Sequence, residues 1–374
     1  MPEEMPVADS VVVTGVGTVT PLGATPDEVL RRVEAGESAA RPPSRFAAAP
    51  FSCPVCAEIP DFDPRRFVGE SKALRLMNAD AALAVAAARL AMRDARLAVD
   101  ADYPGDETAL YGATGLAGVP LLDVAPLVRY SADPNGRFDA RRFGSVALKR
   151  VRPILSFRIL SNMPISFVSI FEGLRGPNAV YNPWEGQGAH AIVAGIRAVE
   201  RGEAACALVG GCDVKTHELA FVALEQQGVF RPWRSGGKGP VPGEGAAFLV
   251  LESQRRAEAR GARIYARVAG YRLGTRPRDA NGSAWYSSLV APLVSPPPAA
   301  IVSAAEDGAP ATDGTAARTT VKPKASAGNL FAAAAALQVA LGAALAWRLG
   351  PGARILANCF GHGTEQAAFL LEAV

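Results

Sequence analysis

Histidine and cysteine are both scarce in this sequence, which limits the chemistry that it can support. Only three histidines occur among 374 residues: His190, His217 and His362. The five cysteines are an odd number in a chain without a secretory signal, so we expect reduced thiols rather than disulfides. Cys53 and Cys56 form a CxxC pair, but neither a second pair nor a nearby histidine completes a zinc set. We therefore expect no metal site.

The chain also lacks a strong charge imbalance and an apolar leader. Its formal net charge is +3, without a basic run interleaved with aromatics, which argues against nucleic-acid binding. The opening MPEEMPVADS is acidic and has no apolar stretch, so we expect no signal peptide and a cytoplasmic protein. The long apolar run at residues 330–349 is rich in alanine and is interrupted by Gln338 and Arg348. This run predicts a buried helix rather than a membrane span.

The remaining pattern is an alternation of strands and helices typical of an α/β protein. Apolar, β-branched segments end at glycines, and alanine and leucine recur at helical spacing between them. We expect the main strands within residues 10–23, 107–115, 176–183, 206–214, 243–253 and 262–271, and helices within 25–36, 78–97, 188–203 and 255–260. We divide the chain into residues 1–253 and 254–374, with a loop-rich, partly mobile stretch around 276–320 that contains three successive prolines.

Five ordered motifs resemble those of the β-ketoacyl synthases. They are VVVTGVGTVTPLG, LRGPNAVYNPWEGQGAHAIVAGIRAVERGEAACALVGGCDV, GEGAAFLVLE, KPKASAGN and NCFGHGTEQAAFLLE, and together they cover most of the chain from Val11 to Glu372. The resemblance implies the thiolase-like fold, with two similar βαβαβα halves in alternating α/β/α/β/α layers. Active members of the family use a cysteine at a helix N-terminus and two histidines.

All three catalytic positions of the family carry other residues in this chain. By resemblance, the cysteine position falls on Glu185 within GPNAVYNPWEGQG. The first histidine position falls on Ala305 within VSAAEDGAPATD, where Pro310 and Asp313 keep the family's spacing. The second falls on Asn329 at the end of KPKASAGN. The chemistry therefore lacks its nucleophile and both stabilising histidines.

Such a degenerate copy resembles the chain length factors of type II polyketide synthases. The resemblance implies a cytoplasmic, non-catalytic subunit that forms a heterodimer with an active ketosynthase and shapes the tunnel for the growing chain. It implies no cofactor of its own, because the partner's chemistry uses phosphopantetheine-bound groups on acyl carrier protein. The divergent residues suggest a system that makes reduced or polyene chains.

The resemblance also implies a tunnel and a dimer seam. Residues expected at the tunnel are Val119, Leu122 and Pro126, taken as one helix face, together with Trp184 and His362. Residues expected at the seam, where a strand pairs across the dimer, are Asn178, Val180, Tyr181 and Asn182. Generic packing explains Val119, Leu122 and Pro126 equally well. Arginines in RYSADPNGRFDARRF and ALKRVRPIL form either a solvated face or a docking patch for acidic carrier protein.

Two other functions stay open from the sequence. The chain could be a malonyl carrier-protein decarboxylase or acyltransferase that uses Glu185 or His362, although Glu185 is better explained as a polar residue that satisfies free N–H groups at the helix start. Similarly, His362 could simply shape the pocket entrance. The third function is a scaffold that binds carrier protein or an acyl chain.

Overall fold

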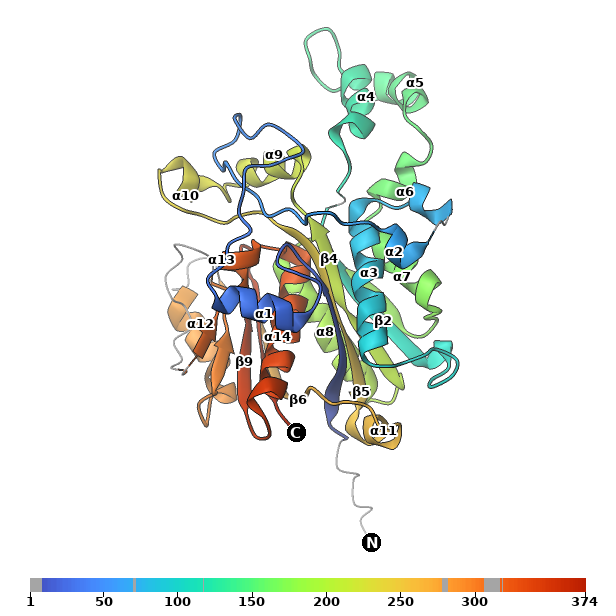
Figure 1. Cartoon of the computed structure of the whole chain (residues 1–374). Helices are drawn as coiled ribbons and strands as arrows, with labels where there is room; N and C mark the ends of the chain where they lie inside the picture. Colours follow the sequence, from blue (N-terminus) through green and yellow to red (C-terminus); the bar gives the residue numbers. More distant parts are fainter. Residues whose placement is uncertain (1–8, 70–71, 117, 278–281, 306–316, 318) are drawn as a thin grey trace.

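The computed structural model describes residues 9–69, 72–116, 118–277, 282–305, 317 and 319–374. Figure 1 shows a body of sheet and helices from which the segment bearing α4 and α5 projects. The strands are β1 (Val11–Val19), β2 (Thr108–Thr114), β3 (Asn178–Tyr181), β4 (Cys206–Val214), β5 (Glu244–Ser253), β6 (Ala266–Thr275), β7 (Ala300–Val302), β8 (Thr319–Val321), β9 (Arg354–Cys359) and β10 (Glu365–Glu372).

Helices of very different length connect these strands. The α-helices are α1 (Pro26–Glu34), α2 (Arg65–Val68), α3 (Ala79–Asp94), α4 (Leu121–Ser131), α5 (Ala140–Ser145), α6 (Leu155–Ile159), α7 (Met163–Glu172), α8 (Glu185–Glu200), α9 (Glu218–Gln226), α10 (Arg231–Arg234), α11 (Gln254–Ala259), α12 (Gly282–Val290), α13 (Pro323–Ala327) and α14 (Ala334–Leu349). Short 3-10 turns are η1 (Lys72–Arg75), η2 (Gly105–Glu107), η3 (Ala147–Arg150), η4 (Ala291–Leu293) and η5 (Phe331–Ala333).

The sheet contains the same strand arrangement twice. Its order is β3-β2-β4-β5-β1-β6-β10-β9-β7-β8, so that β6 to β10 repeat the places of β1 to β5 in mirrored order. In each half three neighbouring strands are parallel, β3-β2-β4 in the first half and β8-β7-β9 in the second. The next strand, β5 or β10, runs antiparallel to both of its neighbours. The halves join where Val12 and Val13 of β1 pair with Arg267 and Ala266 of β6.

Two long helices pack between the halves. Both α8 and α14 contact strands of the first half and of the second half, while α3 covers the outer face of the first half and α12 lies against β6 and β10 of the second. The result is the alternation of helix and strand layers expected of a thiolase-like fold (Figure 1). The apolar run at residues 331–349 is 83% buried in this middle layer, which confirms it as a core helix.

The local sequence explains where the helices begin. Thr25 precedes α1 and accepts a hydrogen bond from the backbone N–H of Glu28, and Asn78 does the same for Ala81 at the start of α3. The expected loop-rich stretch at 276–320 needs correction, because its described part contains α12, β7 and the start of β8. Proline and small residues there mark the ends of these elements. The proposed division between residues 253 and 254 stays a prediction.

Candidate functional site

Glu185 begins α8 and is buried, with 3% of its surface exposed. The chain reaches it from β3 through Asn182 and Pro183, and Trp184 supplies no side-chain cap to the helix. A carboxylate is electrostatically favoured at a helix N-terminus, where backbone N–H groups lack intrahelical partners. The position that the motif assigns to a nucleophile therefore holds a buried charge.

Three donors surround the carboxylate of Glu185. Lys324 Nζ lies 3.0 Å from its Oε1, and Asn329 Nδ2 donates to the same oxygen. The backbone N–H of His362 donates to Oε2 over 2.6 Å. Lys324 also donates to the carbonyl of Phe360 at 2.7 Å. The structure thus brings together two of the three replaced catalytic positions, Glu185 and Asn329. Lys324, which lies within the KPKASAGN motif, binds the same carboxylate.

These contacts keep Glu185 ionised. Burial disfavours the charged carboxylate, but Lys324, His362 and the hydrogen bond from Asn329 outweigh it and lower the pKa of Glu185 to about 2. The carboxylate is therefore a weak base at neutral pH. Its oxygens also accept from three donors, two in the KPKASAGN segment and one in the loop between β9 and β10.

Gly361 allows the loop between β9 and β10 to close over this carboxylate. A Cβ atom at position 361 would lie 1.9 Å from Glu185 Oε2, far inside any real contact distance. A side chain at this position would displace either the loop or the carboxylate. Because Gly361 of the FGHG motif has no side chain, the loop leaves room for a glutamate at position 185.

An aromatic group lies beside the ion pair. The ring centroid of Phe331 is 6.1 Å from that of Trp184 and 6.4 Å from that of His362. Lys215 Nζ lies 5.6 Å from the centroid of the same phenylalanine. Phe331 is fully buried, with a φ of 43° in the left-handed region that side chains other than glycine rarely adopt. Trp184 and His362, which were both expected at the tunnel, therefore share one aromatic neighbour.

The third replaced position contributes no polar group. Ala305 is buried after β7, and its backbone N–H donates to Ser303 Oγ at 3.1 Å. Pro310 and Asp313, which fixed its place in the motif, lie outside the described residues. An alanine here cannot supply the donor that a histidine would supply.

A cavity of about 170 Å³ adjoins the loop over Glu185. Phe360 and Gly361 form one wall, and Trp285 and Tyr286 of α12 contribute another. The hydroxyl of Tyr286 donates to Asn358 Oδ1 at 2.8 Å, which fixes this helix against β9. Neither α12 nor the cavity was predicted from the loop-rich composition.

The expected tunnel wall needs correction. Val119 lies before α4 and is buried, with 3% exposed, whereas Leu122 in the first turn of α4 is 84% exposed. Pro126 lies inside the helix. Helical spacing failed because α4 begins only after Pro120. Leu122 and Pro126 do line a common cavity of about 350 Å³ with arginines of the following segment.

The predicted seam residues lie on an edge strand. β3 is the terminal strand of the sheet and pairs with β2 alone among the described strands. Asn178, Val180 and Asn182 are exposed, while Tyr181 is half-buried and its ring stacks on that of His190 at 6.3 Å. His190 Nε2 also lies 3.9 Å from a carboxylate oxygen of Glu365. The edge therefore presents free backbone groups and an exposed valine.

The other histidine and the CxxC pair have structural roles. His217 caps α9 by accepting from the backbone N–H of Ala220 at 3.4 Å, and burial lowers its pKa to about 4. Cys53 and Cys56 lie in an apolar cluster with Phe221. Burial raises the pKa of the Cys53 thiol to about 11 and that of Cys56 further.

Comparison with known families agrees with this geometry. Residues 8–257 match the family model described as the N-terminal domain of beta-ketoacyl synthase, about two thirds of the chain. The chain belongs to the beta-ketoacyl synthase family. Relatives named 3-oxoacyl-[acyl-carrier-protein] synthase 2 from Synechocystis, Staphylococcus aureus and Coxiella burnetii are 28%, 27% and 29% identical over 70%, 75% and 70% of the chain. The matches span 62%, 65% and 62% of those proteins, respectively.

Solved structures of beta-ketoacyl synthase relatives share the fold over nearly the whole chain. The ishigamide ketosynthase/chain length factor superposes with a TM-score of 0.77 at 24% identity, covering 98% of this chain and 100% of that one. A type II polyketide synthase acyl-carrier protein in complex with its hexaketide-bound ketosynthase gives a TM-score of 0.76 at 18% identity, with the same coverage. These likenesses establish the thiolase-like fold.

Proposed function

We propose that this chain is the non-catalytic partner subunit, or chain length factor, of a type II polyketide ketosynthase. The observation that carries the proposal is the locked carboxylate of Glu185 at the nucleophile position, bound by Lys324 and Asn329. In this proposal the partner ketosynthase forms the carbon–carbon bonds, and this chain shapes the tunnel that receives the growing product. We also propose that the polyketide synthase to which it belongs makes reduced or polyene chains.

The cysteines support a non-catalytic role. A thioester-forming cysteine requires a lowered pKa, typically at a helix N-terminus or beside a cation. All five cysteines here are free and buried, and burial raises the pKa of each thiol. The helix N-terminus that would activate a thiol instead holds Glu185.

The geometry of Glu185 also argues against its use as a general base. A base near neutral pH needs a pKa close to that pH and a free electron pair directed at the substrate. Glu185 has a pKa of about 2 and accepts from three donors. The decarboxylase or acyltransferase alternative would therefore require a rearrangement of this cluster.

The surface supports a large partner interface. Most of the large exposed apolar side chains lie between residues 116 and 180, among them Leu122, Val128, Phe138 and Ile170. This segment leads along the chain into β3, the terminal strand of the sheet. Unpaired strand edges and clustered apolar groups favour association with another protein. The proposed occupant is the active ketosynthase, which would pair with β3 through its own edge strand.

Carrier protein is the second proposed partner. One related structure contains a ketosynthase with its acyl-carrier protein. In this chain the segment from α4 to α6 carries exposed cations that include Arg141, Arg142, Lys149 and Arg152. We expect an acidic carrier protein to be attracted to this segment. Its phosphopantetheine arm would deliver substrate to the partner's cysteine, so this subunit needs no cofactor of its own.

The test is co-expression with a ketosynthase from the same source. We expect light scattering to show a one-to-one complex and malonyl-dependent elongation to require both chains. Val180→Asp, on the exposed edge of β3, should abolish both the complex and elongation. Val222→Asp, at a similarly exposed valine on α9, should leave both intact. A lone chain that elongates or decarboxylates malonyl carrier protein would refute the proposal.

A charge-removing variant separates the chemistry from the assembly. Glu185→Gln combined with Lys324→Met removes both buried charges, and the complex should continue to elongate. If elongation stops while light scattering still shows the one-to-one complex, Glu185 or Lys324 takes part in the reaction. That result would mean that the chain acts as an enzyme and not only as a partner subunit.

A further inference from the structure

A second charged region lies at the opposite end of β5 from the Glu185 cluster. Asn329 accepts from the backbone N–H of Gly243, just before β5, whereas Glu252 lies near the strand's other end. Beside that end is a cavity of about 560 Å³ between the end of α3, the turn after α11 and the last turn of α14. Its volume lies within the range of small-molecule sites.

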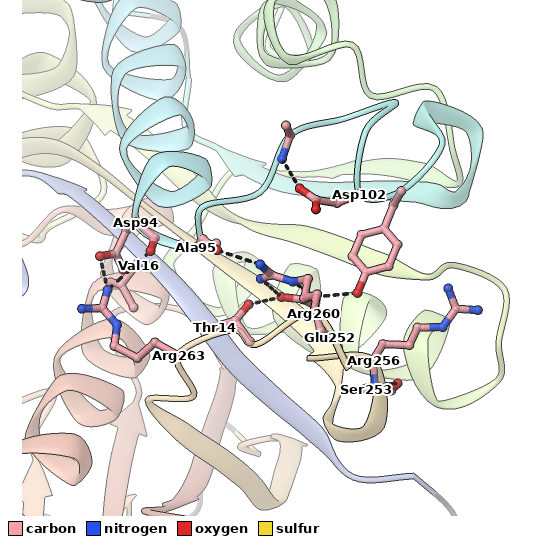
Figure 2. Close-up of polar contacts among 12 residues, drawn as sticks. Thr14, Val16, Asp94, Ala95, Asp102, Glu252, Ser253, Arg256, Arg260 and Arg263 are labelled. Atoms are coloured by element: carbon pink, nitrogen blue, oxygen red, sulfur yellow. Dashed lines mark hydrogen bonds and ion pairs between the residues drawn. The ribbon is translucent and has the colours of Figure 1, made fainter. Parts of the chain in front are cut away.

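The base of this region is a buried carboxylate with its partners (Figure 2). Glu252 accepts from Arg260 through two hydrogen bonds of 2.6 and 2.7 Å, from the hydroxyl of Tyr103 at 2.8 Å and from Thr14 Oγ1. Arg260 also donates to the carbonyl of Ala95 at 3.0 Å. These bonds attach the turn after α11 to the end of α3. The floor of the cavity is therefore fixed before any ligand binds.

One side of the cavity is held by a second ion pair, also drawn in Figure 2. Asp94 accepts from the backbone N–H of Val16 at 2.9 Å and forms an ion pair with Arg263. The guanidinium of Arg263 lies 4.4 Å from the ring centroid of Tyr265, and that ring packs edge-on against Trp347 at 6.2 Å. Trp347 is nevertheless 52% exposed at the cavity. A large flat ring is thus held in place and still accessible.

Two arginines of the same cavity have no such partners. Arg93 and Arg96 are exposed, and among the described residues neither side chain forms a hydrogen bond or an ion pair. Arg96 has a φ of 51°, in the left-handed region where glycine is usual after a helix. The nearby Asp102 carboxylate accepts from the backbone N–H of Ala98 at 2.7 Å. The cavity therefore holds two guanidinium groups that form no ion pair with a described residue, although the carboxylates of Asp94 and Asp102 also line it and Arg93 acts electrostatically on Glu172.

We propose that this cavity binds a phosphorylated ligand with a flat ring, of the nucleoside diphosphate class. Arg93 and Arg96 bind the phosphates, since the planar guanidinium fork matches phosphate oxygens in geometry and charge. The exposed face of Trp347 stacks on the ring. This site is independent of the proposed partner-subunit role, because it lies at the other end of the sheet from Glu185 and away from the β3 edge.

The test measures ADP and pyrophosphate binding to the full chain, alone and with its ketosynthase, by calorimetry and tryptophan fluorescence. We expect saturable binding of ADP and at least tenfold weaker binding of pyrophosphate. The double variant Arg93→Gln/Arg96→Gln should weaken ADP at least tenfold. The control Arg31→Gln/Arg66→Gln makes the same charge change at exposed arginines outside the cavity and should bind ADP unchanged. Trp347→Leu should lower ADP affinity to that of pyrophosphate.

Three results would overturn the proposal. The first is the absence of saturable ADP binding to both the chain and its complex. The second is an equal loss of affinity in the Arg31/Arg66 control, since binding would then reflect net charge alone. The third is unchanged ADP affinity in Trp347→Leu. Thermal melts of each variant identify any loss of affinity that comes from unfolding. The conservative variant Arg93→Lys/Arg96→Lys keeps the charge but removes the planar guanidinium groups, and it should show an intermediate loss of ADP affinity.

Discussion

The Glu185 cluster and the cavity beside Arg93 differ in how their charges are satisfied. At the first, one carboxylate has a lysine, an amide and a backbone N–H within hydrogen-bonding distance. At the second, Arg93 and Arg96 form no hydrogen bond or ion pair with a described residue, and Arg93 acts on Glu172 only electrostatically. Buried charges must be paired because desolvation is expensive, whereas exposed charges can stay free for a ligand. The comparison separates groups that maintain the fold from groups that are available for binding.

Breaking the buried pair should have the largest effect. Glu185→Gln leaves Lys324 charged and buried, so we expect the free energy of unfolding to fall by about 3–5 kcal/mol at neutral pH. Urea denaturation followed by circular dichroism measures it. Adding Lys324→Met should restore much of the loss. Glu37→Gln, which removes an exposed ion pair with Arg32, is the control and should cost at most about 1 kcal/mol.

The pH dependence of this loss follows from the lowered pKa of Glu185. In the unfolded chain the carboxyl titrates near its ordinary value of 4.5, and in the folded chain near 2. Its contribution to stability is therefore complete above about pH 4.5 and is lost as the pH falls towards 2. A difference between wild type and Glu185→Gln that stays constant from pH 6 to pH 2.5 would contradict this assignment.

Asp80 sharpens the comparison, since it is buried without a direct cationic partner. It accepts from the backbone N–H of Gly118 at 2.6 Å, and its other oxygen has no hydrogen-bond partner among the described residues. Burial and the neighbouring Asp213 raise the pKa of Asp80 to about 7. The folded chain therefore holds this proton more tightly than the unfolded chain, whose carboxyl titrates near 3.8. Stability from this group is complete below about pH 3.8 and is lost as the pH rises towards 7.

Asp80→Asn should accordingly stabilise the protein at alkaline pH. We expect a gain of about 2–4 kcal/mol at pH 8 and little change at pH 4, measured by denaturant unfolding at both values. Asp133→Asn, in the loop after α4, provides the background slope. Equal effects at the two pH values would show that Asp80 is ionised throughout or protonated throughout.

A smaller loss is expected at the carboxylate beneath the arginine cavity. Glu252→Gln removes the charge that holds Arg260, yet Arg260 is partly accessible to water and can be solvated. We expect a loss of about 1–3 kcal/mol in urea denaturation, less than at Glu185. A loss as large as that of Glu185→Gln would mean that the two clusters support the fold equally.

The smallest effect on stability should come from the unpartnered arginines. Arg93→Gln/Arg96→Gln should change the free energy of unfolding by no more than about 0.5 kcal/mol, because exposed residues away from packing contribute little. Chemical denaturation without ligand measures it. A large loss would show that these side chains support the end of α3 and are not simply available for a ligand.

Motif spacing predicted the replaced positions well but could not predict their partners. Glu185 and Asn329 are 144 residues apart and meet directly, as expected of a shared site. Lys324 lies in the KPKASAGN motif, but no role could be predicted for it, because ion pairing depends on where α13 packs rather than on spacing. A glutamate at a buried helix start was the available signal, since such a charge requires a cation nearby.

Prediction from periodicity failed where local backbone rules interrupt a helix or where distant segments meet. Val119 was assigned to the face of a helix that begins only after Pro120. Strands β1 to β6 were predicted one by one and β7 to β10 were not. The junction of β1 with β6 depends on two residue pairs and leaves no trace in composition. Likewise, the arginine cavity combines the ends of α3 and α14 with the turn after α11, which only the tertiary structure brings together.

The closure of Gly361 over Glu185 has a consequence for introducing a cysteine and two histidines at the three replaced positions of this chain. A thiol at position 185 would be shorter than the carboxylate and would leave the N–H of His362 and the amine of Lys324 without their present acceptor. Imidazoles would also be needed at positions 305 and 329, in space now filled by an alanine and a fully buried asparagine. Intermediate steps would each carry an unmatched buried charge or a crowded side chain. The present arrangement is therefore separated from one with a cysteine and two histidines by a stability barrier, and replacing all three residues together avoids the unstable intermediates.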